Sequence, residues 1–235
     1  MKILKSIAIP ALAVCVLGMG MTGCSSMNNT GKGALIGGGG GGALGAGIGA
    51  LIGGGKGAAI GTAIGAVVGA GAGTLIGRKM DRQQAELEQQ LANLATIEQT
   101  TDANGLQAIK VTFNGGILFP TNGTTLSQSA KTDLSKFAAS LNANPQTNVQ
   151  IYGYTDDTGT LAVNQRVSTG RADAVRNYLL NSGVAATRLS AEGLPMQDYI
   201  ASNSTAEGRA KNRRVEIYVT ADKSMIEAAE NGTLK

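Results

Sequence analysis

The chain has 235 residues and a formal net charge of +4, with three Phe, five Tyr, two Cys, no Trp and no His. Two of the positive charges lie in a leader segment that we expect to be removed, so the rest of the chain is too nearly neutral to predict nucleic-acid binding. The lack of His, and of any Cys that we expect to stay free, excludes the usual zinc sites and the Ser–His and Cys–His catalytic pairs. We therefore expect no metal, no cofactor and no enzyme activity.

Residues 1–23 have the three parts of an export signal. Met1 to Lys5 is short and basic, Ile7 to Met21 is apolar, and the small residue Gly23 comes last. The apolar run is shorter than a membrane-spanning helix needs, which favours a signal peptide over a transmembrane anchor.

Cys24 is the candidate lipid-attachment residue. The tetrapeptide Met21-Thr22-Gly23-Cys24 resembles a bacterial lipobox, with Met where the first position usually has Leu. The resemblance implies that an acylated Cys24 begins the mature chain, and Ser25 after it, in place of Asp, favours the outer membrane. Cys15 would be lost with the signal, so no disulfide could form within the mature chain. A plain secretory signal, in which Cys24 is only a small residue, is the alternative.

After a polar linker at residues 24–32, glycine recurs at every fourth position from Gly33 to Gly77. Positions i and i+4 are neighbours on a helix, and small residues let helices approach closely in lipid, so the stripe predicts membrane-associated helices. Because four residues overshoot one turn by about 40°, two helices that break near residues 53–57 fit this stripe better than one. The segment resembles the glycine zippers of outer-membrane lipoproteins. Association of several copies through it, and a flexible Gly/Ala linker, remain open alternatives.

Residues 78–105 are expected to form a spacer helix followed by a turn. Arg78, Lys79 and Arg82 bound the apolar stretch and would lie at a head-group surface. Residues 80–99 have a helical pattern and residues 102–105 have a turn pattern. The apolar residues on the expected helix face are Met80, Leu87, Leu91 and Leu94.

Residues 106–221 have the pattern of an ordinary globular domain, and residues 222–235 are expected to be a C-terminal tail. Strands are expected at 108–113, 149–154, 189–191 and 214–219, and helices at 126–141 and 167–180. Strands separated by helices predict an α/β (α+β) fold of two layers, with one sheet of about four strands and helices on one face.

Three motifs give this domain a specific resemblance. Residues 153–159 read Gly-Tyr-Thr-Asp-Asp-Thr-Gly, residues 208–217 read Gly-Arg-Ala-Lys-Asn-Arg-Arg-Val-Glu-Ile, and residues 117–121 read Ile-Leu-Phe-Pro-Thr. The first motif is followed by Asn164, Val167-Ser168 and Arg171-Ala172. Together they resemble the OmpA-like peptidoglycan-binding domain family over nearly all of residues 106–221. With the lipobox and the glycine zipper, the whole chain resembles lipoproteins of the YiaD type.

The resemblance implies a ligand and a site. The family's ligand is the diamino acid of the peptidoglycan stem peptide, usually meso-diaminopimelate, whose side chain ends in an ammonium and a carboxylate. The family's acid maps onto Asp156 and its base onto Arg171, and an arginine fork suits a carboxylate. The other candidate residues are Asn164 and Thr155, and then Phe119, Arg213 and Arg214. The two last arginines would also serve to hold the fold, and a structural ion pair between Asp156 and Arg171 is the alternative to a binding role.

These features predict a non-catalytic, lipid-anchored outer-membrane protein whose periplasmic domain binds peptidoglycan and tethers the membrane to the wall. A peptidoglycan hydrolase would need paired carboxylates, a metal or an activated nucleophile, and the adjacent Asp156 and Asp157 would diverge on an extended chain. The alternative is an oligomeric or pore-like glycine-zipper assembly in the lipid bilayer that wall binding only positions.

Overall fold

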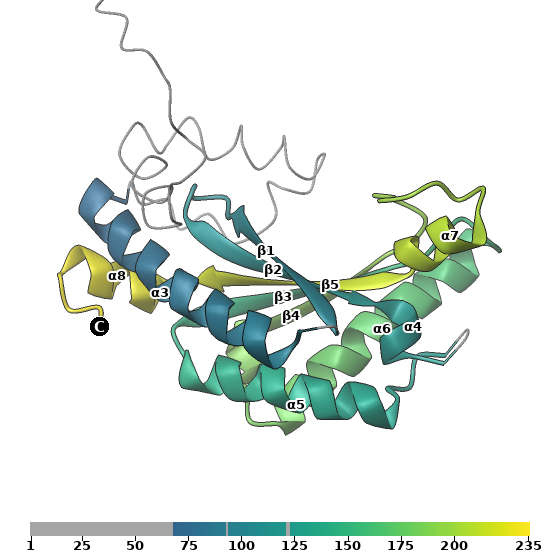
Figure 1. Ribbon diagram of the computed structural model, residues 1–235, viewed down its shortest axis with the longest axis horizontal. Helices are drawn as coiled ribbons and strands as arrows, with labels where there is room; N and C mark the ends of the chain where they lie inside the picture. The colour runs from purple at the N-terminus through teal and green to yellow at the C-terminus, as the bar shows by residue number, and fades with distance from the viewer. Residues whose placement is uncertain (1–67, 93, 121–122) are drawn as a thin grey trace, which may run out of the picture.

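The computed structural model describes residues 68–92, 94–120 and 123–235, so the predictions for the export signal, for Cys24 and for most of the 33–77 segment lie outside the described residues. A five-stranded mixed sheet forms the centre of the described part (Figure 1). Its strands are β1 (Ala95–Thr101), β2 (Gln107–Asn114), β3 (Thr147–Tyr154), β4 (Leu189–Leu194) and β5 (Arg214–Ala221). Their order in the sheet is β1-β2-β5-β3-β4, with β3 and β4 parallel and the other neighbours antiparallel.

Three long helices lie along one face of this sheet (Figure 1). They are α3 (Ala70–Gln90), α5 (Gln128–Ala143) and α6 (Leu161–Asn181). The shorter elements are α4 (Gly115–Leu118), the 3-10 turn η2 (Ala186–Arg188), α7 (Ala206–Asn212) and α8 (Lys223–Glu230). Side-chain caps fix where several helices begin: the Ser127 hydroxyl accepts from the Ala130 N–H and the Thr160 hydroxyl from the Val163 N–H. The predicted α/β class with helices on one face is confirmed.

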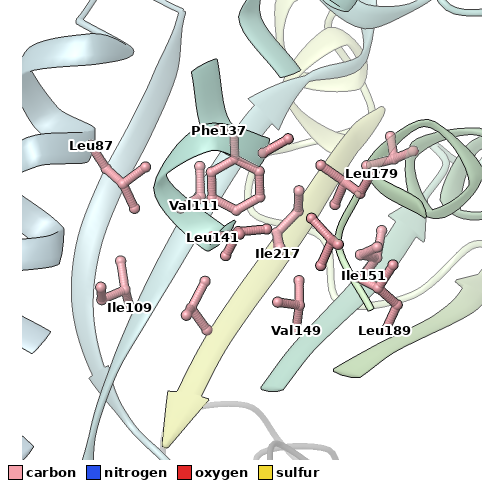
Figure 2. Packing of buried hydrophobic residues seen from close by; sticks show 14 of the residues in the cluster. Leu87, Ile109, Val111, Phe137, Leu141, Val149, Ile151, Leu179, Leu189 and Ile217 are labelled. Atoms are coloured by element: carbon pink, nitrogen blue, oxygen red, sulfur yellow. The ribbon is translucent and has the colours of Figure 1, made fainter. Parts of the chain in front are cut away.

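The core lies between the sheet and the three helices (Figure 2). Alternate strand residues point to the same face, so Ile109, Val111 and Phe113 of β2 all reach this layer. Phe113 meets Phe137 of α5 edge to face, with ring centroids 6.3 Å apart. The central strand β5, last in the sequence, joins the β1–β2 hairpin to the β3–β4 pair.

The first strand of the sheet differs from the sequence prediction. A helix was expected to continue to Gln99, whereas α3 ends at Gln90 and Ala95–Thr101 form β1. β1 pairs antiparallel with β2, from Ala95 opposite Phe113 to Thr101 opposite Gln107. The sheet therefore has five strands rather than about four, because pairing with β2 outweighs the helical pattern of this segment.

The turn between β1 and β2 forms as expected at residues 102–105. The Asp102 carboxylate accepts from the backbone N–H groups of Asn104 and Leu106, at 2.9 and 2.8 Å. Gly105 has a φ of 73°, a left-handed conformation that glycine adopts without strain. Burial raises the pKa of Asp102 to about 6, although these hydrogen bonds act in the opposite direction.

Helix α3 belongs to the domain and is not a separate spacer. It continues without a break through Gly77, where a boundary was expected, and its Ile76, Met80 and Leu87 are fully buried in the core. The predicted apolar face is correct at Met80, Leu87 and Leu91, but Leu94 lies beyond the helix. Part of the expected tail forms α8, which packs against α3 through Met225 and Ile226 and through other buried residues. None of the helices within the described ranges is both long and apolar enough to cross a membrane.

Candidate functional site

A cavity of about 890 Å³ opens where β3 ends. Its walls come from α4 and the segment after it, from the β3–α6 loop, from the first turns of α6 and from Arg213, which precedes β5. In Figure 1 these elements gather at the end of the sheet opposite to α8. Loops converge here because β3 and β4 are parallel and must be joined by a crossover helix, α6.

Asp156 lines this cavity and is held there as an ionised carboxylate. One of its oxygens accepts from the Thr158 N–H at 3.0 Å and from the Thr158 hydroxyl. The other oxygen accepts from Nη1 of Arg213 at 2.6 Å. Burial alone would raise the pKa of Asp156, but the bonds from Thr158 and Arg213 outweigh it and hold the pKa below its ordinary value.

Arg171 lies on α6 and is 4% exposed. Its Nε donates to the Gly123 carbonyl at 3.0 Å, and its guanidinium lies 5.3 Å from the ring centroid of Phe119. Burial lowers the pKa of Arg171, Arg213 lowers it further, and Asp156 acts in the opposite direction. No carboxylate of the described residues forms an ion pair with Arg171, and its two Nη groups have no hydrogen-bond partner among them.

Asn164 and Thr155 shape the loop that carries Asp156. Nδ2 of Asn164 donates to the carbonyls of Thr158 and Thr160, at 2.8 and 3.2 Å, and thereby fixes the turn between β3 and α6. The Thr155 hydroxyl accepts from the Met196 N–H at 3.1 Å, which ties the end of β3 to the loop after β4. Both residues are buried and line the cavity.

The two candidate arginines at the start of β5 lie in different places. Arg213 lines the cavity, and its side chain is 41% exposed and pairs with Asp156. Arg214 does not line it: its guanidinium stacks 3.8 Å from the Tyr154 ring centroid and bonds Glu216 at 2.7 Å. The alternative of an ion pair between Asp156 and Arg171 is not found, since the partner of Asp156 is Arg213.

The structure adds site residues that sequence reasoning missed. Thr158 bonds Asp156 through both its backbone and its side chain, and a threonine two residues after an aspartate is a local signal for such a turn. Arg166 adds a third cation to the lining. Gly115 is required by its contacts, because a Cβ there would lie only 2.5 Å from the Arg213 carbonyl oxygen.

Comparison with known families agrees with this architecture. Residues 118–213 match the model of the OmpA family, and residues 1–81 match that of the YMGG-like Gly-zipper. In the structure the fold extends beyond the range matched by the OmpA model, because α3, β1, β2 and β5 complete the core and the sheet.

Part of the chain is also similar to two curated proteins. The chain is 45% identical over 101 residues to Probable lipoprotein YiaD of Escherichia coli (43% of this chain, 46% of the relative). It is 44% identical over 112 residues to the peptidoglycan-binding protein ArfA of Mycobacterium tuberculosis (48% of this chain, 34% of the relative). The matched part thus spans less than half of either curated relative.

Two solved structures share the fold. One is a MotB-like protein from Desulfovibrio vulgaris, with a TM-score of 0.55 and 25% identity over 64% of this chain and 96% of that one. The other is the cell wall anchor of the T6SS from Pseudomonas aeruginosa, with a TM-score of 0.51 and 29% identity over 59% of this chain and 99% of that one.

Proposed function

We propose that this protein is a non-catalytic outer-membrane lipoprotein that binds the diamino acid of peptidoglycan stem peptides and tethers the outer membrane to the cell wall. The observation that carries the proposal is one cavity that holds an ionised acid, Asp156, and a buried arginine, Arg171, that pairs with no acid of the described residues. The names of two relatives, a peptidoglycan-binding protein and a cell wall anchor, support it.

The chemistry of the ligand matches these two groups. Diaminopimelate in a stem peptide ends in an ammonium and a carboxylate on the same carbon. The ammonium would bind Asp156, and the carboxylate would bind the Nη groups of Arg171 as a bidentate pair. Phe119 and Asn164 would fix the positions of the arginine and of the Asp156 loop.

The set of acids at the cavity supports binding without catalysis. Among the described residues that line it, Asp156 is the one carboxylate, and the adjacent Asp157 is exposed and not part of the lining. Glycoside hydrolysis in its common form uses two carboxylates on either side of the scissile bond. Asp156 is moreover ionised and hydrogen-bonded, which does not suit a general acid.

The membrane side of the proposal rests on the N-terminal sequence. An acylated Cys24 and the helices of residues 33–77 would hold the chain in the bilayer, with the OmpA-family domain in the periplasm. The match of residues 1–81 to a glycine-zipper family also favours a second candidate, a membrane assembly of zipper helices that wall binding positions.

Co-sedimentation with purified sacculi tests the proposal. The full chain in detergent should sediment with diaminopimelate-containing sacculi, and Asp156→Ala and Arg171→Ala should each abolish this. Removing one partner of a buried charge pair costs about 2–5 kcal/mol, or roughly thirtyfold or more in affinity.

A matched control separates binding from folding. Arg176 lies on α6 as Arg171 does, but outside the cavity lining, so Arg176→Ala should sediment like the parent chain. Melting temperatures measured beside binding identify variants that fail to fold, and Asp156→Asn and Arg171→Gln serve as milder changes. Full binding by a folded Arg171→Gln variant would exclude this site.

A further inference from the structure

The charges that line the cavity are unbalanced. The described lining contains three arginines, Arg166, Arg171 and Arg213, against one acid, Asp156. Two positive charges are therefore left without a negative partner inside the lining. A ligand that brings an ammonium and a carboxylate in equal number does not remove this excess, so the two ligand charges meet unequal environments.

Asp156 is already occupied before any ligand arrives. Both of its oxygens accept hydrogen bonds, one from Thr158 and one from Arg213 at 2.6 Å. An incoming ammonium must share this carboxylate with Arg213, and it also meets the repulsion of the neighbouring guanidinium groups. The net gain from the ammonium is therefore smaller than it would be at a carboxylate without these hydrogen bonds.

Arg171, unlike Asp156, still has charged groups without a hydrogen-bond partner among the described residues. It is 4% exposed, its Nε is used by the Gly123 carbonyl, and its Nη groups have no partner among the described residues. Burying this cation on folding therefore costs desolvation free energy that no ion pair with a described residue offsets. A ligand carboxylate supplies the missing partner in a site of low dielectric, where a charge-assisted bidentate bond is strong.

We propose that the cavity is selective for the carboxylate of the diamino acid, and that it rejects stem peptides in which this carboxylate is amidated. The ammonium contributes less to affinity than the carboxylate does. This inference rests on the proposed function and adds the chemical state of the ligand that the site accepts. An amide keeps the planar shape of the acid, but it replaces one acceptor oxygen with an N–H₂ donor that faces the arginine fork, and it carries no charge.

Calorimetry with three synthetic stem peptides tests the order of the two contributions. The probes carry diaminopimelate, its side-chain amide, or 2-aminopimelate, which keeps the carboxylate and has hydrogen in place of the ammonium. For the full chain in detergent, the amide should bind at least about thirtyfold more weakly than the acid, by the cost of an unpaired buried charge. The 2-aminopimelate peptide should lose less than the amide does.

The other possible affinity orders would contradict either the inference or the proposed function. Equal affinity for the acid and the amide, or a larger loss for 2-aminopimelate, would overturn the inference and leave the proposed function standing. Binding of none of the three peptides would overturn the proposed function and the inference with it. Because the ligand is changed and not the protein, this series does not depend on the folding of a variant.

An Arg171→Gln variant assigns the selectivity to one residue. It should bind the acid much more weakly than the parent chain does, so that the ratio between the affinities for acid and amide falls toward one, since the buried cation that pairs with the carboxylate is gone. Arg176→Gln, on the same helix outside the lining, should keep the full ratio. An undiminished ratio in folded Arg171→Gln would refute the role of Arg171.

Discussion

Truncation of Leu87 tests whether α3 is part of the domain core. Leu87 is fully buried, and Figure 2 shows it extending from α3 toward Ile109 and Val111 of β2. Leu87→Ala removes the transfer free energy of the lost methyl groups and leaves a cavity, which together cost about 2–5 kcal/mol. A spacer helix in solvent would lose almost nothing by the same change.

The size of the domain converts this cost into a melting temperature. For roughly 150–250 residues, 1 kcal/mol corresponds to about 2–4 °C. Leu87→Ala should therefore lower the melting temperature by about 4–20 °C. Because a typical domain has only about 5–15 kcal/mol of stability, the upper part of this range would leave it partly unfolded at 37 °C.

Thermal denaturation followed by circular dichroism, on the full chain in detergent, is the assay. Glu86→Ala is the matched control, since Glu86 is the neighbouring residue on α3 and is exposed. Its effect should stay within about 0.5 kcal/mol. Indistinguishable melting temperatures for the two variants would refute the assignment of α3 to the core.

Three further predictions concern other parts of the chain. Mass spectrometry of the mature protein should find acyl chains on an N-terminal Cys24, and an unmodified Cys24 would remove the lipid anchor from the proposal. Replacing Gly45 and Gly49 with Ile should reduce cross-linking between copies in membranes, because bulk separates helix backbones, whereas unchanged cross-linking would support a flexible linker. The pKa of Asp102 is near 3.9 in an unfolded chain and about 6 in the fold, so the folded state holds the extra proton and stability falls as pH rises from 4 to 6. The parent chain should lose up to about 3 kcal/mol more than Asp102→Asn over this range, and parallel curves for the two proteins would contradict that pKa.

Local patterns predicted most of the domain, because its strands alternate cleanly and its long helices have apolar faces. β1 was missed for a physical reason: Ala95–Thr101 contains one strong apolar residue, Ile97, among Glu, Gln and Thr, which suits an exposed helix as well as an edge strand. Pairing with β2 decides between them, and that partner is not visible in a local window. α8 was missed although Asp222 supplies a helix cap, accepting from the Met225 N–H at 2.8 Å.

The prediction of the site residues depended more on the family resemblance than on the local chemistry of the sequence. An isolated Asp156 and Arg171 would have favoured a structural ion pair. The partner that Asp156 has in the structure, Arg213, lies 57 residues away in the sequence, and only the position of β5 beside β3 brings them together. The same topology separates Arg213 from Arg214, because successive residues at the start of a strand point to opposite faces.

The continuity of α3 has a mechanical consequence. If one end of the molecule is held by lipid and the other by the wall, tension between them enters the domain along this helix. A helix joined only by a flexible turn could be pulled away one residue at a time. Here Ile76, Met80, Leu87 and Leu91 would have to leave the core together, so the load is shared over several turns of the helix, about 20–25 Å along its axis. The attachment resists force as a unit, and it should yield abruptly when it yields at all.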